Sequence, residues 1–211
     1  ANLVEGGQLV ESGEYVVSDV DEGDVVTLAP SAVTALRFDA QGNPIAVGTS
    51  LPEQAALLAM LSVTPTTVVD ATSTSGTFEW IFDAGIEGFE FLGQGETLKL
   101  EYTLTAEDSF GATATQNVEV IIEGVNDAPV ALNASESLDE NELFNGNVTA
   151  TDVDGSIAGY ALVSGVARGT LSFNANGSYS FNPGTAFDYL AEGETTTVTF
   201  SYRATDNTGA V

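Results

Sequence analysis

The chain has 211 residues and a formal net charge of −27, because 31 Asp and Glu residues face four Lys and Arg residues. This balance excludes nucleic-acid binding by counterion release, which requires Lys and Arg, and it disfavours adsorption to anionic lipid. The absence of Cys and His excludes disulfides, thiolate nucleophiles and the usual zinc ligands, whereas the many carboxylates favour divalent cations as neutralising partners.

The length fits two domains of about 100 residues each. No apolar run approaches the roughly 18 residues that span a bilayer, so membrane insertion is not expected. Nothing at the N-terminus resembles a signal peptide. Because the sequence starts abruptly at Ala1 and stops at Val211, we expect a fragment of a longer protein whose targeting signal lies outside it.

Apolar and polar residues alternate along most of the chain, which is typical of half-buried antiparallel strands. A clear example is the series Leu100, Tyr102, Leu104 and Ala106. Earlier in the chain, Phe78, Trp80 and Phe82 share one face of a strand and are predicted to fill a core. The pattern predicts an all-β fold made of β-sandwiches.

The segment from about Ala29 to Thr72 differs in character from the rest. LRFDAQGNPIAV predicts a hairpin around Gln41–Pro44. SLPEQAALLAML is rich in good helix formers, and Ser50 followed by Glu53 has the spacing of a capping box. We therefore predict one short helix near Pro52–Leu61, packed on the sandwich.

The chain contains two copies of one module. FEFLGQGETLKLEYTLTAEDSFGA at Phe89–Ala112 aligns without a gap on FDYLAEGETTTVTFSYRATDNTGA at Phe187–Ala210, with nine identities in 24 positions. Upstream, GEYVVSDVD aligns on GNVTATDVD at Gly146–Asp154. Two blocks that match in the same order indicate a duplication, and residues 29–72 are then an insert in the first copy.

The copies meet in IIEGVNDAPVAL at Ile121–Leu132, where Gly and Asn-Asp turn the chain and Pro129 prevents a helix. We predict one sandwich in residues 1–125 and another in residues 126–211. A connection this short predicts that two sandwiches follow one another end to end.

The second copy has a hairpin signature and an incomplete end. Asn176-Gly177 predicts a type I′ turn between the short strands Leu171–Phe173 and Tyr179–Phe181. The first copy continues past its matching block with TATQNVEVIIE, whereas the second stops at Val211. We therefore expect the second sandwich to lack its final strand in this chain, which would leave the edge beside Ala204–Asp206 open.

Acidic motifs recur at matching places in the two copies. They are Asp19-Val20-Asp21 in the first copy and Asp152-Val153-Asp154 in the second. A D-x-D motif at a strand end can direct two carboxylates at one cation, and calcium takes six to eight oxygen ligands. With Asn126-Asp127 in the connection between the copies, the pattern indicates calcium binding at the junction.

Two segments resemble a known family. GETLKLEYTLTAEDSFGATATQNVEVIIEGVNDAPV (Gly95–Val130) resembles the tail of a VCBS repeat, and DENELFNGNVTATDVDG (Asp139–Gly155) resembles the start of the next one. VCBS repeats are cadherin-like modules of large bacterial surface and RTX-type adhesins. The resemblance implies tandem cadherin-like or Ig-like β-sandwiches at the extracellular bacterial cell surface, with calcium (Ca²⁺) at the junctions and neighbouring repeats of the same polypeptide as partners.

Similarity to cadherin-type junctions also implies the ligands. The lower domain would offer Glu90 and Glu5, the linker Asn126 and Asp127, and the upper domain Asp152, Asp154 and Asp206. The same register implies that Asp19, Asp21 and Asp108 serve a junction with a preceding repeat.

These expectations favour a structural function over an enzymatic one. The chain is predicted to be a calcium-rigidified extender, or spacer, of a large secreted adhesin involved in surface attachment and biofilm formation. The alternative is a glycan- or peptide-binding module, or a split domain of the same adhesin, which the insert favours. The insert contains a single aromatic residue, Phe38, whereas a ligand-stacking site would need several.

Overall fold

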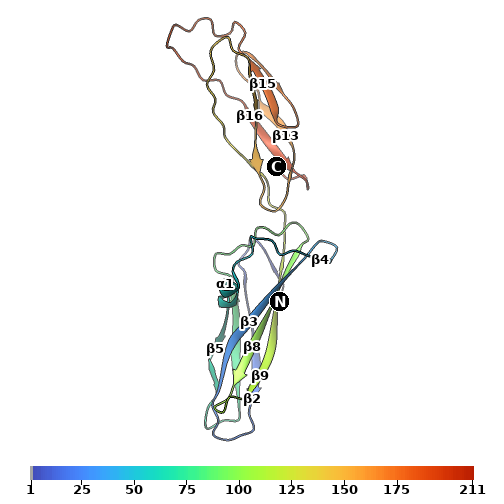
Figure 1. The fold of residues 1–211 in the computed structure, drawn as a ribbon, viewed down its shortest axis with the longest axis vertical. Helices are drawn as coiled ribbons and strands as arrows, with labels where there is room; N and C mark the ends of the chain where they lie inside the picture. Colours follow the sequence, from blue (N-terminus) through green and yellow to red (C-terminus); the bar gives the residue numbers. More distant parts are fainter. Residues whose placement is uncertain (1) are drawn as a thin grey trace. The chain divides into compact units, whose positions relative to one another are not determined.

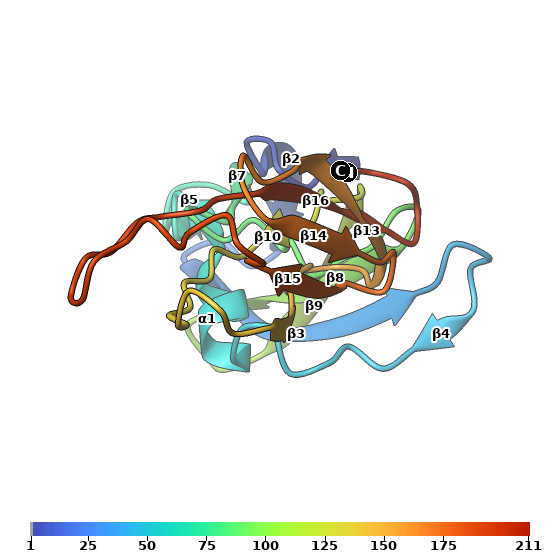
Figure 2. The same cartoon turned by 90° about the horizontal axis from the view of Figure 1, so that it is seen from above.

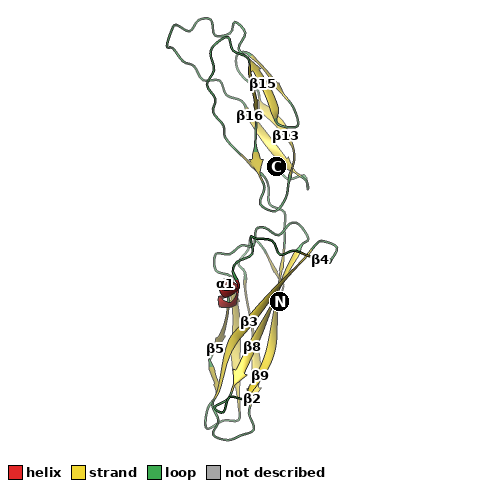
Figure 3. Cartoon of the chain, in the orientation of Figure 1, coloured by secondary structure: helices red, strands yellow, loops and turns green. Residues whose placement is uncertain are grey.

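The computed structural model describes residues 2–211, which divide into two compact units, a first that ends at Val125 and a second that spans Asn126–Val211 (Figure 1). Strands form nearly all of the regular structure in both units, and the described residues contain one short helix (Figure 3). The predicted all-β fold with one helix in the insert is therefore confirmed. No helix in residues 2–211 is long and apolar enough to cross a membrane.

The first unit is a sandwich of two sheets. One sheet has the strand order β1-β9-β8-β3-β4, with β6 also paired with β3, and the other has the order β2-β7-β5. The strands of the first sheet are β1 Asn2–Val4, β3 Val26–Phe38, β4 Pro44–Ile45, β6 Thr67–Val69, β8 Thr97–Glu107 and β9 Thr113–Glu123. Those of the second are β2 Val10–Ser18, β5 Leu61–Thr64 and β7 Ser75–Asp83.

The core of the first unit lies between these sheets, where alternate residues of each strand point inward. Phe78, Trp80 and Phe82 of β7 are buried as predicted, and they face the buried alternate residues of β8. The rings of Phe82 and Tyr102 lie 6.1 Å apart across the sandwich. The hydroxyl of Tyr102, which is fully buried, donates a hydrogen bond to the carbonyl of Leu57 at 2.9 Å. This bond ties the insert to the centre of the core.

The insert extends the sandwich rather than forming a separate body. Its predicted hairpin is confirmed, because Arg37 pairs with Ile45 and Phe38 with Pro44 across a turn at residues 39–43. Figure 2 shows this hairpin of β3 and β4 projecting from the sheet. The side-chain amide of Asn43 donates a hydrogen bond to the Asp39 carboxylate at 3.0 Å, and this bond, together with those from backbone N–H groups of the turn, lowers the pKa of Asp39.

The helix α1 covers Gln54–Ala59, which is shorter than the predicted Pro52–Leu61. The predicted capping box is wrong: Glu53 is the N-cap, and no side chain caps the helix. A capping box at Ser50 would require Leu51 to be helical, but the following proline disfavours the α conformation there. At the other end, Leu61 pairs with Phe82 as the first residue of β5, so sheet pairing ends the helix.

The second unit has shorter strands in three small sheets, with the orders β10-β12, β11-β15-β14 and β13-β16. The bounds are β10 Val130–Ala131, β11 Phe144–Asn147, β12 Ala150–Thr151, β13 Ile157–Ser164, β14 Thr170–Phe173, β15 Ser178–Asn182 and β16 Ser201–Asp206. Aromatic rings pack against one another inside, including Tyr179 and Phe200, whose centroids lie 4.9 Å apart.

The predicted hairpin of the second unit is confirmed in its strands but not in its turn. β14 and β15 pair with Phe173 opposite Tyr179. Gly177 has a φ of 87°, but Asn176 is not among the residues with positive φ. A type I′ turn needs positive φ at both central positions, so the turn is of another kind. A four-residue connection, Asn174–Gly177, replaces the two-residue turn that was expected.

The matching strands β8 and β16 differ in how many neighbours they have. β8 pairs with β3 on one side and β9 on the other, whereas β16 pairs with β13 alone. Residues 195–200, which align on Thr97–Tyr102 at the start of β8, form no strand in the described part of the chain. Figure 2 shows the segment between β15 and β16 as a loop that projects away from the strands of its unit.

Candidate metal centre

The D-x-D motif of the second unit forms a tight turn just after β12. One carboxylate oxygen of Asp152, Oδ1, accepts hydrogen bonds from the N–H of Gly155 at 2.8 Å and the N–H of Asp154 at 3.3 Å. A Cβ at Gly155 would lie 2.8 Å from Oδ1 of Asn207, so a larger residue here would displace the Asn207 side chain. The turn therefore fixes the Asp152 side chain and leaves its second oxygen, Oδ2, for another partner.

The start of the second unit folds back onto this turn. The N–H of Asp127 donates to Oδ2 of Asp154 at 3.2 Å. The side-chain amide of Asn126 donates to Oδ2 of Asp206 at 2.7 Å. The structure thus brings together the linker residues and the three upper-domain residues that the resemblance implied.

Asp206 is 2% exposed and organises the end of β16. Its Oδ1 accepts hydrogen bonds from the N–H groups of Thr208, Gly209 and Ala210 at 2.6–2.9 Å. Burial by itself raises the pKa of Asp206, but hydrogen bonds from Asn126 and the turn outweigh it and lower the pKa to about 2. Asp206 is therefore a permanent anion at the edge of the cluster.

Three other oxygens in the cluster are buried and have no hydrogen-bond partner within residues 2–211. They are Oδ2 of Asp127, Oδ2 of Asp152 and Oδ1 of Asp154. Burial raises the pKa of Asp154, and the neighbouring carboxylates of Asp152 and Asp127 raise it further. Oxygens of this kind are ligands that calcium prefers, so the donor set fits that ion.

The lower-domain residues lie at the end of the first unit where the chain leaves it. Glu5 is 3% exposed, and its Oε1 accepts a hydrogen bond from the N–H of Val125 at 2.6 Å. Glu90 is exposed, and its carboxylate folds over Gly88, where a Cβ would come within 2.2 Å of Oε1. Their roles as calcium ligands stay predictions.

A second acidic group lies at the opposite end of the first unit, where β9 begins. Of residues 2–211, Asp19, Asp24 and Asp108 form the group of three carboxylates whose oxygens all lie within 4.8 Å of one another. Asp19 and Asp108 were predicted, whereas Asp21 is exposed and lies outside this group.

The sequence reasoning missed Asp24. One pattern could have found it, because Asp24 is in phase with the buried residues Val26 and Leu28 of β3. A carboxylate on the inward face of a strand is unusual unless it has a partner.

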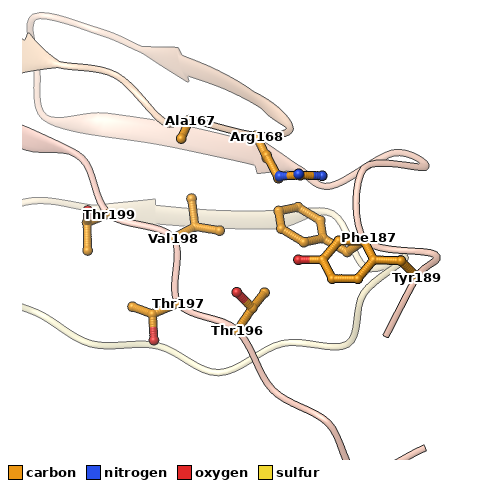
Figure 4. A pocket seen from close by; sticks show the side chains of 8 residues that line it. All are labelled: Ala167, Arg168, Phe187, Tyr189, Thr196, Thr197, Val198 and Thr199. Atoms are coloured by element: carbon orange, nitrogen blue, oxygen red, sulfur yellow. The ribbon is translucent and has the colours of Figure 1, made fainter. Parts of the chain in front are cut away.

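A small pocket of about 230 Å³ lies elsewhere in the second unit, between the β13–β14 connection and the loop before β16. Figure 4 shows Arg168 beside Phe187 and Tyr189, with Val198 pointing into the same space. The guanidinium of Arg168 lies 5.3 Å from the centre of the Tyr189 ring. The volume is below the roughly 300 Å³ at which small-molecule pockets begin, so this space is not the candidate site.

Comparisons with known proteins give one family model that matches the second unit. No curated protein sequence matches the chain. Among solved structures, the protocadherin gammaB4 extracellular domain aligns at 16% identity and a TM-score of 0.40 over 97% of this chain and 30% of its own. Mouse cadherin-23 EC22-24 aligns at 20% identity and a TM-score of 0.38 over 100% of this chain and 57% of its own. Residues 126–211 match the model of the bacterial cadherin-like domain, which supports a cadherin-like module in the second unit.

Proposed function

We propose that the chain is a pair of calcium-rigidified extender modules of a large secreted bacterial adhesin of the VCBS or RTX type, acting in surface attachment and biofilm formation. The observation that carries the proposal is the set of three buried, unpartnered carboxylate oxygens of Asp127, Asp152 and Asp154. The cadherin-like module in residues 126–211 supports an extracellular adhesion-type role.

Within residues 2–211, no ion pair neutralises a carboxylate of the second unit. Both ion pairs of residues 2–211, Arg37 with Glu96 and Lys99 with Glu119, lie in the first unit. Buried carboxylates that lack a cation repel one another and raise each other's pKa. A bound calcium ion reverses the sign of this interaction, so the cluster favours binding the ion over staying empty.

Calcium at this cluster would act on the linker through the chain itself. Asp127 is the second residue of the second unit, and Asn126 is bonded directly to Val125 of the first. Within residues 2–211, oxygens of Asp19, Asp24 and Asp108 all lie within 4.8 Å of one another, whereas those of Asp127, Asp152 and Asp154 do not. A shared ion would therefore have to draw the three linker-cluster oxygens closer together. The start of the linker is thereby fixed to the turn after β12, which restricts bending.

The proposed location follows from the affinity expected of such a site. Extracellular calcium modules bind with dissociation constants on the order of 10⁻⁴ to 10⁻³ M. Such a site fills in sea water or host fluids and stays empty in cytoplasm, so the stiffening operates only outside the cell.

Backbone relaxation of ¹⁵N-labelled protein tests this function at the linker. In excess calcium, the amides of Asn126 and Asp127 should have order parameters near 0.85, and in chelator they should fall toward about 0.6. The amide of Tyr102, in the middle of β8, serves as the internal control and should not change. Equal order parameters for the two linker amides in calcium and chelator would contradict the proposal.

A further inference from the structure

The strand β16 of the second unit has one edge that no strand of residues 2–211 occupies. β13 pairs with β16 on one side, from Ser201 to Asp206. In the first unit, the matching strand β8 has both sides filled, because β9 pairs with it along its whole length, Thr97–Glu107. An unfilled edge leaves backbone N–H and C=O groups available to an added strand.

The side chains behind this edge are less covered than their counterparts in the first unit. Tyr102 and Leu104 of β8 are fully buried, whereas the aligned Phe200 and Tyr202 are only half-buried. Within Asn126–Val211, the buried apolar residues are Val148, Phe187 and Ala204. The core of the second unit is therefore open at the place where β9 covers the core of the first.

The apolar face behind the edge is nevertheless held in place. The hydroxyl of Tyr202 lies within hydrogen-bond distance of the carbonyl oxygens of Leu132 and Thr149, at 2.5 and 2.8 Å. The ring of Phe200 packs on that of Tyr179, with the centroids 4.9 Å apart. Both aromatic side chains are thus positioned before any strand is added, which reduces the ordering that binding would require.

The register of β9 on β8 defines the segment that would fit. β9 places its buried Val118 and Val120 opposite inward-facing residues of β8, and these residues align on Phe200 and Val198. An antiparallel segment with apolar residues at two alternate positions would cover the second unit in the same way. β-branched residues such as valine are favoured there because they fit a pleated, half-buried surface.

Arg203 adds a preference for charge. It is exposed on β16 and forms no ion pair within residues 2–211. It aligns with Thr105, which lies opposite Thr115 of β9. An acidic residue at that position of an added strand would lie directly opposite Arg203, where opposite charges stabilise strand pairing.

We propose that the second unit binds an extended segment of a partner polypeptide as an additional antiparallel strand on the free edge of β16. The segment has alternating apolar residues opposite Val198 and Phe200 and an acidic residue opposite Arg203. A second copy of the chain is a poor donor, because each copy carries a net charge of −27 and its β9 is already paired with β1 and β8. The proposal does not rest on calcium binding.

Hydrogen exchange of the full chain with a synthetic peptide tests the proposal. The peptide has the sequence of Thr113–Glu123 with Thr115→Glu, so it carries the apolar pattern of β9 and an acid opposite Arg203. At saturation it should slow exchange in Thr197–Phe200 by at least about tenfold, because these residues gain a strand partner, and leave the amide of Tyr102 unchanged. The same peptide with Val118→Ser and Val120→Ser should bind roughly 100-fold more weakly, because it lacks two apolar side chains to bury.

Charge reversal at Arg203 tests the register. The variant Arg203→Glu alters an exposed side chain and should melt as the parent chain does. It should bind the Thr115→Glu peptide about two- to fivefold more weakly than the parent chain does, and a Thr115→Lys peptide more tightly by a similar factor.

Two results would overturn the proposal. One is unchanged exchange in Thr197–Phe200 at saturating peptide, or equal affinity for the peptide with Val118→Ser and Val120→Ser. The other is protection of Thr197–Phe200 that grows with the concentration of the chain alone, which would place a second copy on this edge.

Discussion

Calcium at about 10 mM should raise the melting temperature of the second unit by roughly 6–20 °C over its value in chelator. For dissociation constants on the order of 10⁻⁴ to 10⁻³ M, mass action stabilises the bound form by about 1.4–2.7 kcal/mol. A domain of this size shifts by about 4–8 °C for each kcal/mol. The change Asp152→Ala with Asp154→Ala should remove most of the gain, because it deletes two of the three orphaned oxygens.

The design separates this effect from general charge reduction and from the first unit. Asp139→Ala with Glu192→Ala also removes two carboxylates of the second unit, both outside the cluster, and should leave the calcium gain intact. Trp80, the one tryptophan of the chain, lies in the core of the first unit, so its fluorescence follows that unit separately from calorimetry. Identical melting curves of the second unit in calcium and in chelator would contradict the hypothesis that this unit binds calcium.

Backbone amides in Thr197–Phe200, which form no strand, should exchange with solvent at least about 10³-fold faster than those of Lys99–Tyr102, the matching stretch of β8. β8 is hydrogen-bonded on both sides and buries Leu100, Tyr102 and Leu104 completely. Its amides open only with the whole unit, whereas unpaired segments open at almost no cost in free energy, and about 4 kcal/mol of difference corresponds to 10³-fold.

Dilution and a second segment make the exchange experiment specific. The measurement belongs in dilute protein, because an open strand edge can pair with another molecule and gain protection. Amides of Tyr160–Leu162 in β13, which pair with β16, provide a reference inside the second unit. Equal protection of the two matched stretches in dilute monomer would show that the edge is closed and the repeat alignment wrong at its last strand.

The sequence predicted best what depends on local alternation. Phe78, Trp80 and Phe82 could be assigned to the core because a strand with a period of two can bury only one face. The hairpin around Gln41–Pro44 and the helix in the insert could also be predicted, because each depends on residues that are close together in the sequence. The predicted capping box at Ser50 was wrong, and the sequence already held the reason: Pro52 disfavours the helical conformation at Leu51.

What the sequence could not predict depends on segments that meet only in the fold. Asp24 joins Asp19 and Asp108 because the end of β2, the start of β3 and the end of β8 lie side by side. Residues 197–200 have the alternation of β8 but form no strand, because alternation describes a face and a strand also needs a hydrogen-bonded neighbour. Matching motifs therefore located the candidate ligands, while burial in the structure showed which oxygens lack partners.

The spread of distances between the two units tests the stiffening most directly. The chain has no Cys, so Val16→Cys in β2 and Val163→Cys in β13, both exposed positions, would carry one spin label each at unique sites. Pulsed electron resonance should give a broad distance distribution in chelator and a clearly narrower one in calcium. The same labelled chain with Asp152→Ala and Asp154→Ala should stay broad in both conditions. If the labelled chain with an unmutated linker cluster gives distance distributions of equal width with and without calcium, the result would contradict a calcium-rigidified extender.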